Sequence, residues 1–597
     1  MSPPLRASNE GLLSPRVARA QGTHRAIPPP LTIAPIIVYP HRIMKPIKGR
    51  APDHAALRAL LSEGTTHLQA GRLQEAEGAY RKALDLAPNH PDALHHLGLL
   101  LYRLNRFDEA IATISRAIEQ APASPLYWFN LGVVNQKAAR PDEAIRAYRQ
   151  AVALNPRHLE AWINLGNGLK DRGAIPESIE AYQKALTLNP SHADTHNNLG
   201  VALKEQGQIE RAIASYRQAL QLKPTHLEAL NNLGLALLEM GSLDEAIASF
   251  TQALTIMPSY LKALYNLGIA WSWAGENEKS VDCLQRAATA KHDHGKPVTD
   301  AFVYRSRIKH DLEQVQYLFD RQRLNEAQRP YLDSLQQLRD ELDRRLAPGN
   351  RVPITPQELA PVAASFNRLL YRAKAPHLPD GALHPALDVE AVESRYLAKQ
   401  PEATFIDGLL KDEALEELRQ FCWESTIWKK DYENGYSGAF LGDGFASPLL
   451  LQIAEELRLK FPRIFKQHRL TQAWAFKHDS ARRGLNIHAD AAAVNVNFWI
   501  TPDEANLNRE TGGLVVYDKE APRTWNFQDY NSDQNKPKIL TWLKQVGAQT
   551  MKIPYRANRA IVFNSDLFHE TDEIAFKDDY LSRRINITLL YGHRLRP

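Results

Sequence analysis

Small and apolar residues recur with a fixed period through the first half of the chain. A Leu-Gly pair returns every 34 residues, and a proline returns with the same step. A period of this length predicts an array of two-helix repeats, each ended by the proline, which cannot continue a helix. The Leu-Gly pairs are Leu97-Gly98, Leu131-Gly132, Leu165-Gly166, Leu199-Gly200, Leu233-Gly234 and Leu267-Gly268, and the prolines are Pro88, Pro122, Pro156, Pro190, Pro224 and Pro258.

Each repeat also carries a small residue, a large apolar residue four positions later and an alanine three positions after that. These spacings place all three on one helical face, which predicts the buried face of the second helix. The glycine of the Leu-Gly pair is expected to let the partner helix approach closely. Seven repeats fit between residues 57 and 295, and the second of them carries Ala110, Ile114 and Ala117 at these positions.

One polar position keeps the same period. An asparagine directly precedes five of the Leu-Gly pairs, and this position is expected to face the concave groove of the array. An asparagine side chain offers a donor and an acceptor on one short arm, which suits an extended peptide backbone. The alternative is that these side chains hydrogen-bond within or between neighbouring repeats. The series consists of Asn130, Asn164, Asn198, Asn232 and Asn266.

The pattern changes after residue 295. Residues 296–400 lose the period but still predict helices over Asp311–Phe319 and Tyr331–Arg345, so we interpret them as a helical spacer. Two more helices, near Glu413–Glu424 and Pro448–Phe461, precede a series of short apolar segments. Short strands separated by turns favour a barrel or jelly roll. The expected strands are Leu470–Lys477, Leu485–Ala489, Val494–Ile500, Gly513–Tyr517, Thr550–Pro554, Arg559–Phe563 and Arg584–Leu590.

Composition narrows the class of protein. A net charge of +5 is small for 597 residues and does not favour a nucleic-acid partner, and no apolar run is long enough to cross a bilayer. Two cysteines are too few for a disulfide framework, which favours a reducing, cytoplasmic location. Residues 1–50 hold nine prolines, eight Lys or Arg and one acid, which predicts a disordered basic tail. The predicted domains are the tail 1–50, the repeat array 51–295, the spacer 296–400 and a strand-rich domain 401–597.

A histidine and an aspartate two residues apart indicate candidate chemistry in the second half. On a strand, His488 and Asp490 point to the same side because the side-chain period is two. An imidazole and a carboxylate supply two of the three ligands of a mononuclear Fe(II) site that keeps positions open. His569, 81 residues further on, is expected to supply the third ligand. His478 and His593 are alternative ligands, but neither has a carboxylate at strand spacing.

An arginine on a predicted apolar strand indicates a bound anion. Arg584 follows His569 by 15 residues, and a buried arginine needs a partner. A carboxylate is a good partner because a guanidinium can bind it through two parallel hydrogen bonds. Asn586 and Thr588 are expected to share the face of Arg584. Arg583 is expected to face solvent, although a register shift of one residue would exchange the two arginines.

Both halves resemble known families. The 34-residue pattern resembles the tetratricopeptide repeat, and the asparagine series resembles the one lining the superhelix of the O-linked GlcNAc transferases. His-x-Asp, the distal histidine and Arg-x-Asn together resemble the 2-oxoglutarate/Fe(II) dioxygenases over about residues 402–594, including Gly512-Gly513-Leu514 and a prolyl-hydroxylase-like start at Phe405-Ile406-Asp407. The resemblance implies an all-α tetratricopeptide repeat superhelix followed by a double-stranded β-helix (jelly-roll) domain with flanking helices.

The same resemblance implies roles for the candidate residues. His488, Asp490 and His569 would bind the catalytic iron, and Arg584, with Asn586 and Thr588 beside it, would bind the distal carboxylate of 2-oxoglutarate. With Fe(II), 2-oxoglutarate and O2, such enzymes hydroxylate an unactivated C–H bond. The repeat groove implies that the substrate is a protein or peptide. The sequence does not identify a second residue for the carboxylate of the cosubstrate.

Two alternatives stay open at this point. The dioxygenase could act on a small molecule while the repeats recruit partners, or the chain could be a repeat scaffold without catalysis. Succinate formation that needs Fe(II) and 2-oxoglutarate separates the first from the second. A glycosyltransferase, which the repeats alone would suggest, lacks the expected alternation of strands and helices in the second half.

Overall fold

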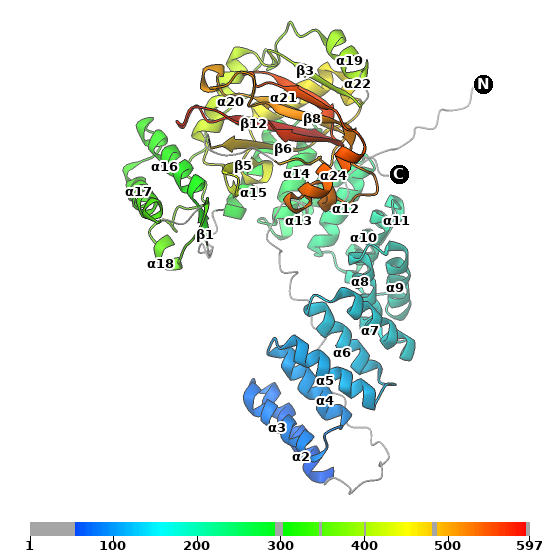
Figure 1. Cartoon of the computed structure of the whole chain (residues 1–597). Helices are drawn as coiled ribbons and strands as arrows, with labels where there is room; N and C mark the ends of the chain where they lie inside the picture. The colour runs from blue at the N-terminus through cyan, green and yellow to red at the C-terminus, as the bar shows by residue number, and fades with distance from the viewer. Residues whose placement is uncertain (1–53, 293–301, 346–348, 399–400, 480–485, 593–597) are drawn as a thin grey trace, which may run out of the picture. The chain divides into compact units, whose positions relative to one another are not determined.

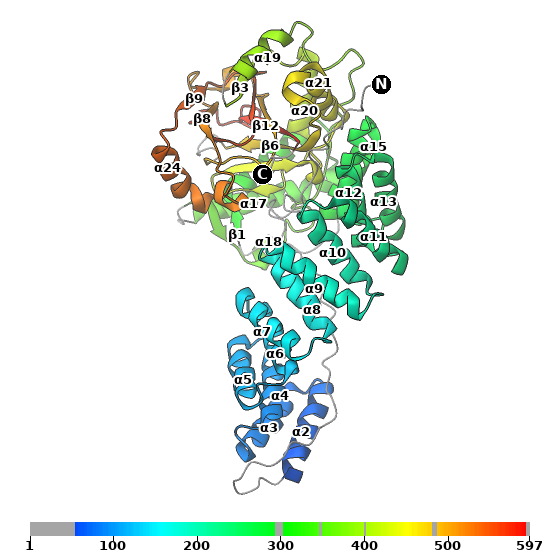
Figure 2. The same cartoon turned by 90° about the vertical axis from the view of Figure 1, so that its right-hand side faces the viewer.

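The computed structural model describes residues 54–292, 302–345, 349–398, 401–479 and 486–592 (Figure 1, Figure 2), so the predicted tail and His593 lie outside the described residues. The chain divides into two compact units, with the boundary between Ala236 and Leu237. We call the described residues 54–236 the N-terminal unit and the described residues 237–592 the C-terminal unit. The boundary falls inside the repeat array, so the last helices of the array belong to the C-terminal unit.

Residues 54–292 form paired helices, as the period predicts, and no helix of the described residues is long and apolar enough to cross a bilayer. The helices are α2 (His54–Gln69), α3 (Leu73–Leu86), α4 (Pro91–Arg103), α5 (Phe107–Gln120), α6 (Pro125–Lys137), α7 (Pro141–Leu154), α8 (Leu159–Asp171), α9 (Ile175–Leu188), α10 (Ala193–Glu205), α11 (Ile209–Leu222), α12 (Leu227–Glu239), α13 (Leu243–Ile256), α14 (Leu261–Trp273) and α15 (Asn277–His292).

The glycine of each Leu-Gly pair makes room for a large side chain of the partner helix. A Cβ atom on Gly166 would lie 2.6 Å from Cε1 of Tyr182, and one on Gly132 would lie 2.5 Å from Cε1 of Tyr148. Both tyrosines are buried. The close approach expected from the sequence is therefore confirmed, and a larger residue at these positions would force the two helices of a repeat apart.

The described residues 302–345 and 349–398 form a small helical layer that packs on the C-terminal sheet. Both helices predicted in this stretch are present. The elements are β1 (Phe302–Tyr304), α16 (Arg305–Asp320), α17 (Arg329–Arg344), β2 (Arg351–Pro353), α18 (Pro356–Leu359) and α19 (Val389–Ala398). Buried Arg307 of α16 pairs with Asp431, and Glu313 of the same helix pairs with Arg583. These ion pairs join the layer to the strands that follow it.

Two antiparallel sheets, with helices between their strands, form the rest of the C-terminal unit. A seven-stranded sheet has the order β3-β10-β7-β12-β6-β5-β4, and a three-stranded sheet has the order β11-β8-β9. Trp499 of the larger sheet and Leu514, Ile553 and Leu567 of the smaller one belong to one buried cluster. The strands are β3 (Ala403–Ile406), β4 (Lys430–Asp431), β5 (Tyr436–Phe440), β6 (Leu470–His478), β7 (Val494–Trp499), β8 (Leu514–Glu520), β9 (Thr550–Ile553), β10 (Ala560–Asn564), β11 (Leu567–Thr571) and β12 (Ile585–Tyr591). Helices α20 (Asp412–Glu424) and α21 (Pro448–Lys460) match the two predicted helices closely.

One predicted strand is wrong. Residues 486–493 form no strand, and their only ladder contact among the described residues is an isolated bridge between His488 and His569. The backbone of Ala489 instead bonds outside any ladder: its N–H donates to Tyr530 O, and its carbonyl accepts from Asn531 Nδ2. The apolar residues that predicted a strand are buried by this irregular packing.

The last repeat is tied directly to the sheet of its own unit. Trp273 Nε1, at the end of α14, donates to Leu470 O of β6 at 2.7 Å. Lys291 Nζ and His292 Nε2, at the end of α15, both contact Asp443 Oδ1, at 2.5 and 2.8 Å. Asp443 is buried, so the ammonium of Lys291 and the contact with His292 stabilise a carboxylate that would otherwise be costly to bury.

Removing the last repeats is therefore expected to destabilise the sheet. A fragment of residues 301–597 lacks α14 and α15 and leaves the buried Asp443 without Lys291 and His292, whereas a fragment of residues 241–597 keeps both helices. We expect the longer fragment to unfold cooperatively and the shorter one to be insoluble or to unfold at a lower temperature. Thermal unfolding followed by circular dichroism measures this, and equal midpoints for the two fragments would contradict it.

Candidate metal centre

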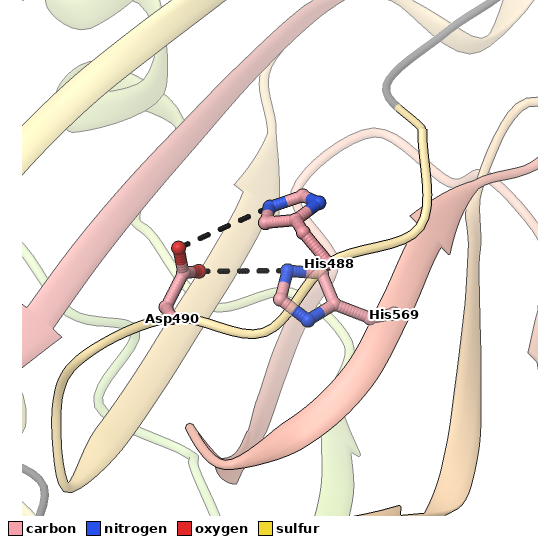
Figure 3. Close-up of side chains that lie close together, drawn as sticks. All are labelled: His488, Asp490 and His569. Carbon is pink, nitrogen blue, oxygen red and sulfur yellow. Dashed lines mark ion pairs between the residues drawn. The ribbon is translucent and has the colours of Figure 1, made fainter. Parts of the chain in front are cut away.

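Three side chains from distant parts of the sequence converge in the C-terminal unit. The ligand atoms of His488, Asp490 and His569 all lie within 4.8 Å of one another (Figure 3). His488 Nε2 is 3.9 Å from Asp490 Oδ1, and His569 Nε2 is 3.5 Å from Asp490 Oδ2. Within the described residues no other group of three or more His, Cys, Asp or Glu could hold a metal ion. Two imidazoles and one carboxylate are a donor set suited to a divalent transition metal.

Backbone hydrogen bonds hold this group together. His488 and His569 exchange N–H···O bonds of 3.0 and 2.8 Å, and the N–H of Asp490 donates to Ser565 O. The Nδ1 atoms of the two imidazoles contact backbone carbonyls, at 2.8 Å for His488 and 3.1 Å for His569. With Nδ1 donating to a carbonyl, Nε2 of each ring faces the site, where it would bind a metal ion in its unprotonated form.

The convergence does not depend on the predicted strand. The expectation that His488 and Asp490 lie on a strand was wrong, because the segment that carries them is irregular. The same two side chains nevertheless point to one place, because Ala489 between them is held by Tyr530 and Asn531. We call residues 486–493, which carry His488 and Asp490, the ligand loop. The short segment before helix α24 (Lys536–Gln545) therefore holds the ligand loop in place.

A chain of amides leads to the carboxylate of Asp490. Asn495 Nδ2 donates to Asp490 Oδ2 at 2.7 Å, and Asn497 Nδ2 donates to Asn495 Oδ1 at 2.5 Å. Asn586 Nδ2 and Thr588 Oγ1 both donate to Asn497 Oδ1 at 2.8 Å. Burial raises the pKa of Asp490, but the contacts with His569, His488 and Asn495 outweigh it and hold the pKa below its usual value. The carboxylate is thus ionised and fixed.

Asn495→Ala is expected to weaken divalent metal binding by about 10- to 100-fold, the usual effect of removing a hydrogen bond to a ligand. The physical reason is that Asp490 loses the donor that fixes its orientation. Titration of the metal-free protein with Mn(II), followed by electron paramagnetic resonance, measures the affinity. Asn506→Ala is the matched control, because Asn506 is also a buried asparagine but donates to Thr511 O. Equal metal affinity in the two variants would contradict the prediction.

Arg584 lies beside the three ligands in the same pocket. Its side chain is 1% exposed, and its Nε and Nη2 donate to the carbonyls of Gly512 and Gly513 at 2.6 and 3.3 Å. Burial lowers the pKa of Arg584 to about 10, so the guanidinium remains charged at neutral pH. Its Nη1 has no hydrogen-bond partner among the described residues. A buried cation with an unused donor is the feature expected of an anion-binding residue.

The Gly512-Gly513 turn is required for this arrangement. Gly512 has φ +81°, which favours glycine, and a Cβ atom on Gly513 would lie 1.8 Å from Ile553 O. Glycine is therefore needed at both positions for the two carbonyls to reach Arg584. The glycines that formed part of the sequence resemblance therefore have a structural role in holding the guanidinium.

The pocket collects the six residues that the sequence proposed for metal and cosubstrate binding. Its wall also contains residues that the sequence did not single out. Trp474 and Phe476 are two positions apart on β6, so their spacing predicts that they share one face of the strand. The sequence alone does not give the strand register, and so it could not show that this face lines the site. The lining residues are Trp474, Phe476, His488, Asp490, Asn497, Leu514, His569, Thr571, Arg584, Asn586 and Thr588.

Arg583 and His478 are not part of the candidate metal-binding group. The prediction that Arg583 faces solvent was wrong, because it is buried on the opposite face of the sheet from Arg584 and pairs with Glu313 of α16. His478 does not belong to the metal-binding group. His593 lies outside the described residues.

The asparagine series makes contacts between repeats. Asn130 Nδ2 lies 2.7 Å from His95 Nε2, Asn198 Nδ2 donates to Asn167 Oδ1 and Asn232 Nδ2 donates to Asn197 Oδ1. Each bond joins one repeat to the preceding one. All five asparagines, which include Asn164 and Asn266, are half-buried. Three of the asparagines thus connect neighbouring repeats. These contacts do not test whether the series also binds a peptide.

Comparison with known proteins concerns mainly the repeats. The family model described as the cilia and flagella-associated protein 70 C-terminal domain matches residues 40–255, and the tetratricopeptide repeat model matches residues 237–298. Both matches end before residue 299. No curated protein matches the chain.

Several solved structures are similar to part of the chain. YrrB, described as a TPR protein with an unusual peptide-binding site, is 24% identical, with 30% of this chain and 93% of YrrB covered and a TM-score of 0.27. MamA is 26% identical, with 27% and 95% covered and a TM-score of 0.26. A tetratricopeptide repeat protein from Parabacteroides merdae is 16% identical, with 40% and 95% covered and a TM-score of 0.33. The helical half of the chain is an array of tetratricopeptide repeats, and a multi-strand antiparallel sheet region follows it.

Proposed function

We propose that the C-terminal unit is an Fe(II)- and 2-oxoglutarate-dependent dioxygenase with a double-stranded β-helix, or jelly-roll, core. The observation that carries the proposal is the placement of His488, Asp490 and His569 in one pocket with the buried guanidinium of Arg584. Either feature alone is common in proteins. Together they supply a metal ligand set and an anchor for an acidic cosubstrate, which is the combination that this chemistry needs.

The residues fit the metal. Both histidines present Nε2 to the site because their Nδ1 atoms face backbone carbonyls, and Asp490 is ionised. With three protein ligands, a bound divalent metal would keep positions open for the cosubstrate and oxygen. Fe(II) with 2-oxoglutarate and O2 would supply the oxidation, in which one oxygen atom enters succinate and the other enters the substrate.

The protein residues then have defined tasks. Arg584 binds and orients the distal carboxylate of 2-oxoglutarate, while Asn586 and Thr588 line the wall beside it. Trp474, Phe476 and Leu514 give the pocket an apolar wall that limits water. Asn495 holds Asp490 in a fixed orientation. A ligand set, a carboxylate anchor and a shielded wall are what the chain contributes to the reaction.

A protein or peptide is the substrate class that the repeats favour. Tetratricopeptide arrays bind peptides or proteins, and here the array is covalently joined to the proposed catalytic unit. A segment bound by the repeats would have a raised effective concentration at the iron. The asparagines keep a part in this proposal, since a carbonyl oxygen such as that of Asn130 or Asn232 could accept from a peptide N–H while its amide nitrogen braces the array.

Succinate formation tests the function. The purified full-length chain, supplied with Fe(II), 2-oxoglutarate and O2, should form succinate and CO2, and chelation of iron should stop the reaction. Uncoupled turnover makes this measurable before the substrate is known. A chain that binds Fe(II) but forms no succinate, with or without peptide libraries, would contradict the proposal.

A further inference from the structure

Arg584 and three residues that neighbour it in the sheet each have a buried polar atom without a hydrogen-bond partner. Within the described residues they are Arg584 Nη1, His478 Nε2, Trp499 Nε1 and Asn586 Oδ1. Buried polar groups in folded proteins are almost always satisfied, so several unsatisfied ones in one place indicate a missing partner. The group contains up to three donors, which suit an anion, and one acceptor, Asn586 Oδ1, which cannot bind one.

The strand register places the four residues next to one another on one face of the sheet. The N–H of His478 donates to Arg584 O at 3.0 Å, so the two residues are opposite each other on β6 and the start of β12. Asn586 is opposite Trp499 on β7. Arg584 and Asn586 are two positions apart and therefore lie on one face of the strand. Trp474 and Phe476 share the face of His478 and line the pocket, so His478 continues the pocket side of β6.

His478 is suited to donate one hydrogen bond without adding charge. Its side chain is 1% exposed, and its ring packs against Tyr436 with 5.2 Å between centroids. Burial and the neighbouring Arg584 lower the pKa of His478 well below its usual value, so the ring is neutral. A neutral imidazole with its proton on Nε2 is a donor at that atom.

We infer that His478 is the second residue that binds the distal carboxylate of the cosubstrate, with its Nε2–H donating beside Nη1 of Arg584. This inference rests on the proposed function and names a residue that the sequence did not identify. The single positive charge of Arg584 balances one carboxylate. The neutral ring of His478 would add a hydrogen bond that orients this carboxylate without adding a second positive charge. The ligand class is therefore a 2-oxo acid with a second carboxylate at its far end, in preference to a 2-oxo monocarboxylate.

Two 2-oxo acids of equal chain length test the inference. 2-Oxoglutarate carries the distal carboxylate, and 2-oxopentanoate has a methyl group in its place. Their dissociation constants are measured by calorimetry with the full-length protein, without oxygen and with Mn(II) in place of Fe(II). The wild-type chain should prefer 2-oxoglutarate by about 100-fold or more, since two hydrogen bonds to a charged group are at stake.

His478→Phe keeps a ring of similar size but removes the donor. It should weaken 2-oxoglutarate binding by about 10- to 100-fold, the range for one hydrogen bond to a charged group, and leave 2-oxopentanoate binding unchanged. His478→Gln restores a donor and should recover most of the affinity. Lys477→Leu is the matched control, because Lys477 is a buried neighbour on the other face of β6. It should keep the wild-type preference.

The outcomes separate the two proposals. If the wild type binds 2-oxoglutarate tightly and His478→Phe has the same preference, the role of His478 is wrong and the dioxygenase assignment stands. If the Mn(II)-loaded wild type binds neither acid, both fail. A His478→Phe chain that does not fold is replaced by His478→Leu in the same comparison. The wild-type measurement decides independently of any variant, because a preference below about 10-fold is too small for two charged hydrogen bonds and overturns the inference.

Discussion

His488→Ala and Asp490→Ala are each expected to abolish Fe(II) binding and, with it, succinate formation. Each change removes one of three ligands whose donor atoms lie within 4.8 Å of one another. The loss should exceed the about 10- to 100-fold effect of outer contacts such as Asn495. Asp490→Asn should also lose most of the affinity, because it keeps the shape of the side chain but removes the charge that a divalent cation needs. Metal content after anaerobic purification and succinate release measure both effects.

His468→Ala is the control for this experiment. His468 is a half-buried histidine outside the pocket, so its removal should leave the metal content and turnover unchanged. The prediction also requires that the ligand variants keep the fold, which circular dichroism checks. A folded His488→Ala chain with wild-type iron content would remove the basis for the metal centre.

Arg584→Met is expected to weaken 2-oxoglutarate binding by about 30- to 5,000-fold, which corresponds to the about 2 to 5 kcal/mol lost when one partner of a buried charge pair is cut. Methionine fills much of the same volume but cannot bind a carboxylate. Metal binding should persist, because Arg584 is not a ligand. Calorimetry with the Mn(II)-loaded chain measures the change in affinity.

The neighbouring arginine offers a matched control. Arg583 is as deeply buried as Arg584, but it pairs with Glu313 on the other face of the sheet. Arg583→Met should therefore lower the unfolding temperature and leave 2-oxoglutarate affinity of the folded protein unchanged. The opposite pattern, with affinity lost in Arg583→Met and kept in Arg584→Met, would mean that the two residues have exchanged roles.

The repeat array could be predicted because its cause is local. The contact between Gly166 and Tyr182 recurs in repeat after repeat, so the same residue types return at the same spacing and reveal the helix pair. The partners of the asparagines were not accessible in this way. Asn130 and Asn198 bond to different residue types in the preceding repeat, so the period shows the series but not its contacts.

The candidate site was also largely visible in the sequence, for a different reason. Candidate metal ligands and a buried arginine are conspicuous residue types in an apolar strand pattern. The sequence could not show what holds them, since those contacts come from distant segments. The ligand loop is shaped by Asn531, and Arg583 is buried by Glu313, which lies in a helix far earlier in the chain. The two-residue spacing therefore predicted correctly that the side chains of His488 and Asp490 lie together, although the strand on which that prediction was based is not formed.

The most direct test is electron density from crystals grown without oxygen in the presence of Mn(II) and 2-oxoglutarate. The account predicts one metal ion bound by His488 Nε2, His569 Nε2 and a carboxylate oxygen of Asp490. It also predicts 2-oxoglutarate on that metal with its far carboxylate against Nη1 of Arg584. A metal ion bound elsewhere, or a cosubstrate whose far carboxylate does not contact Arg584, would contradict the account.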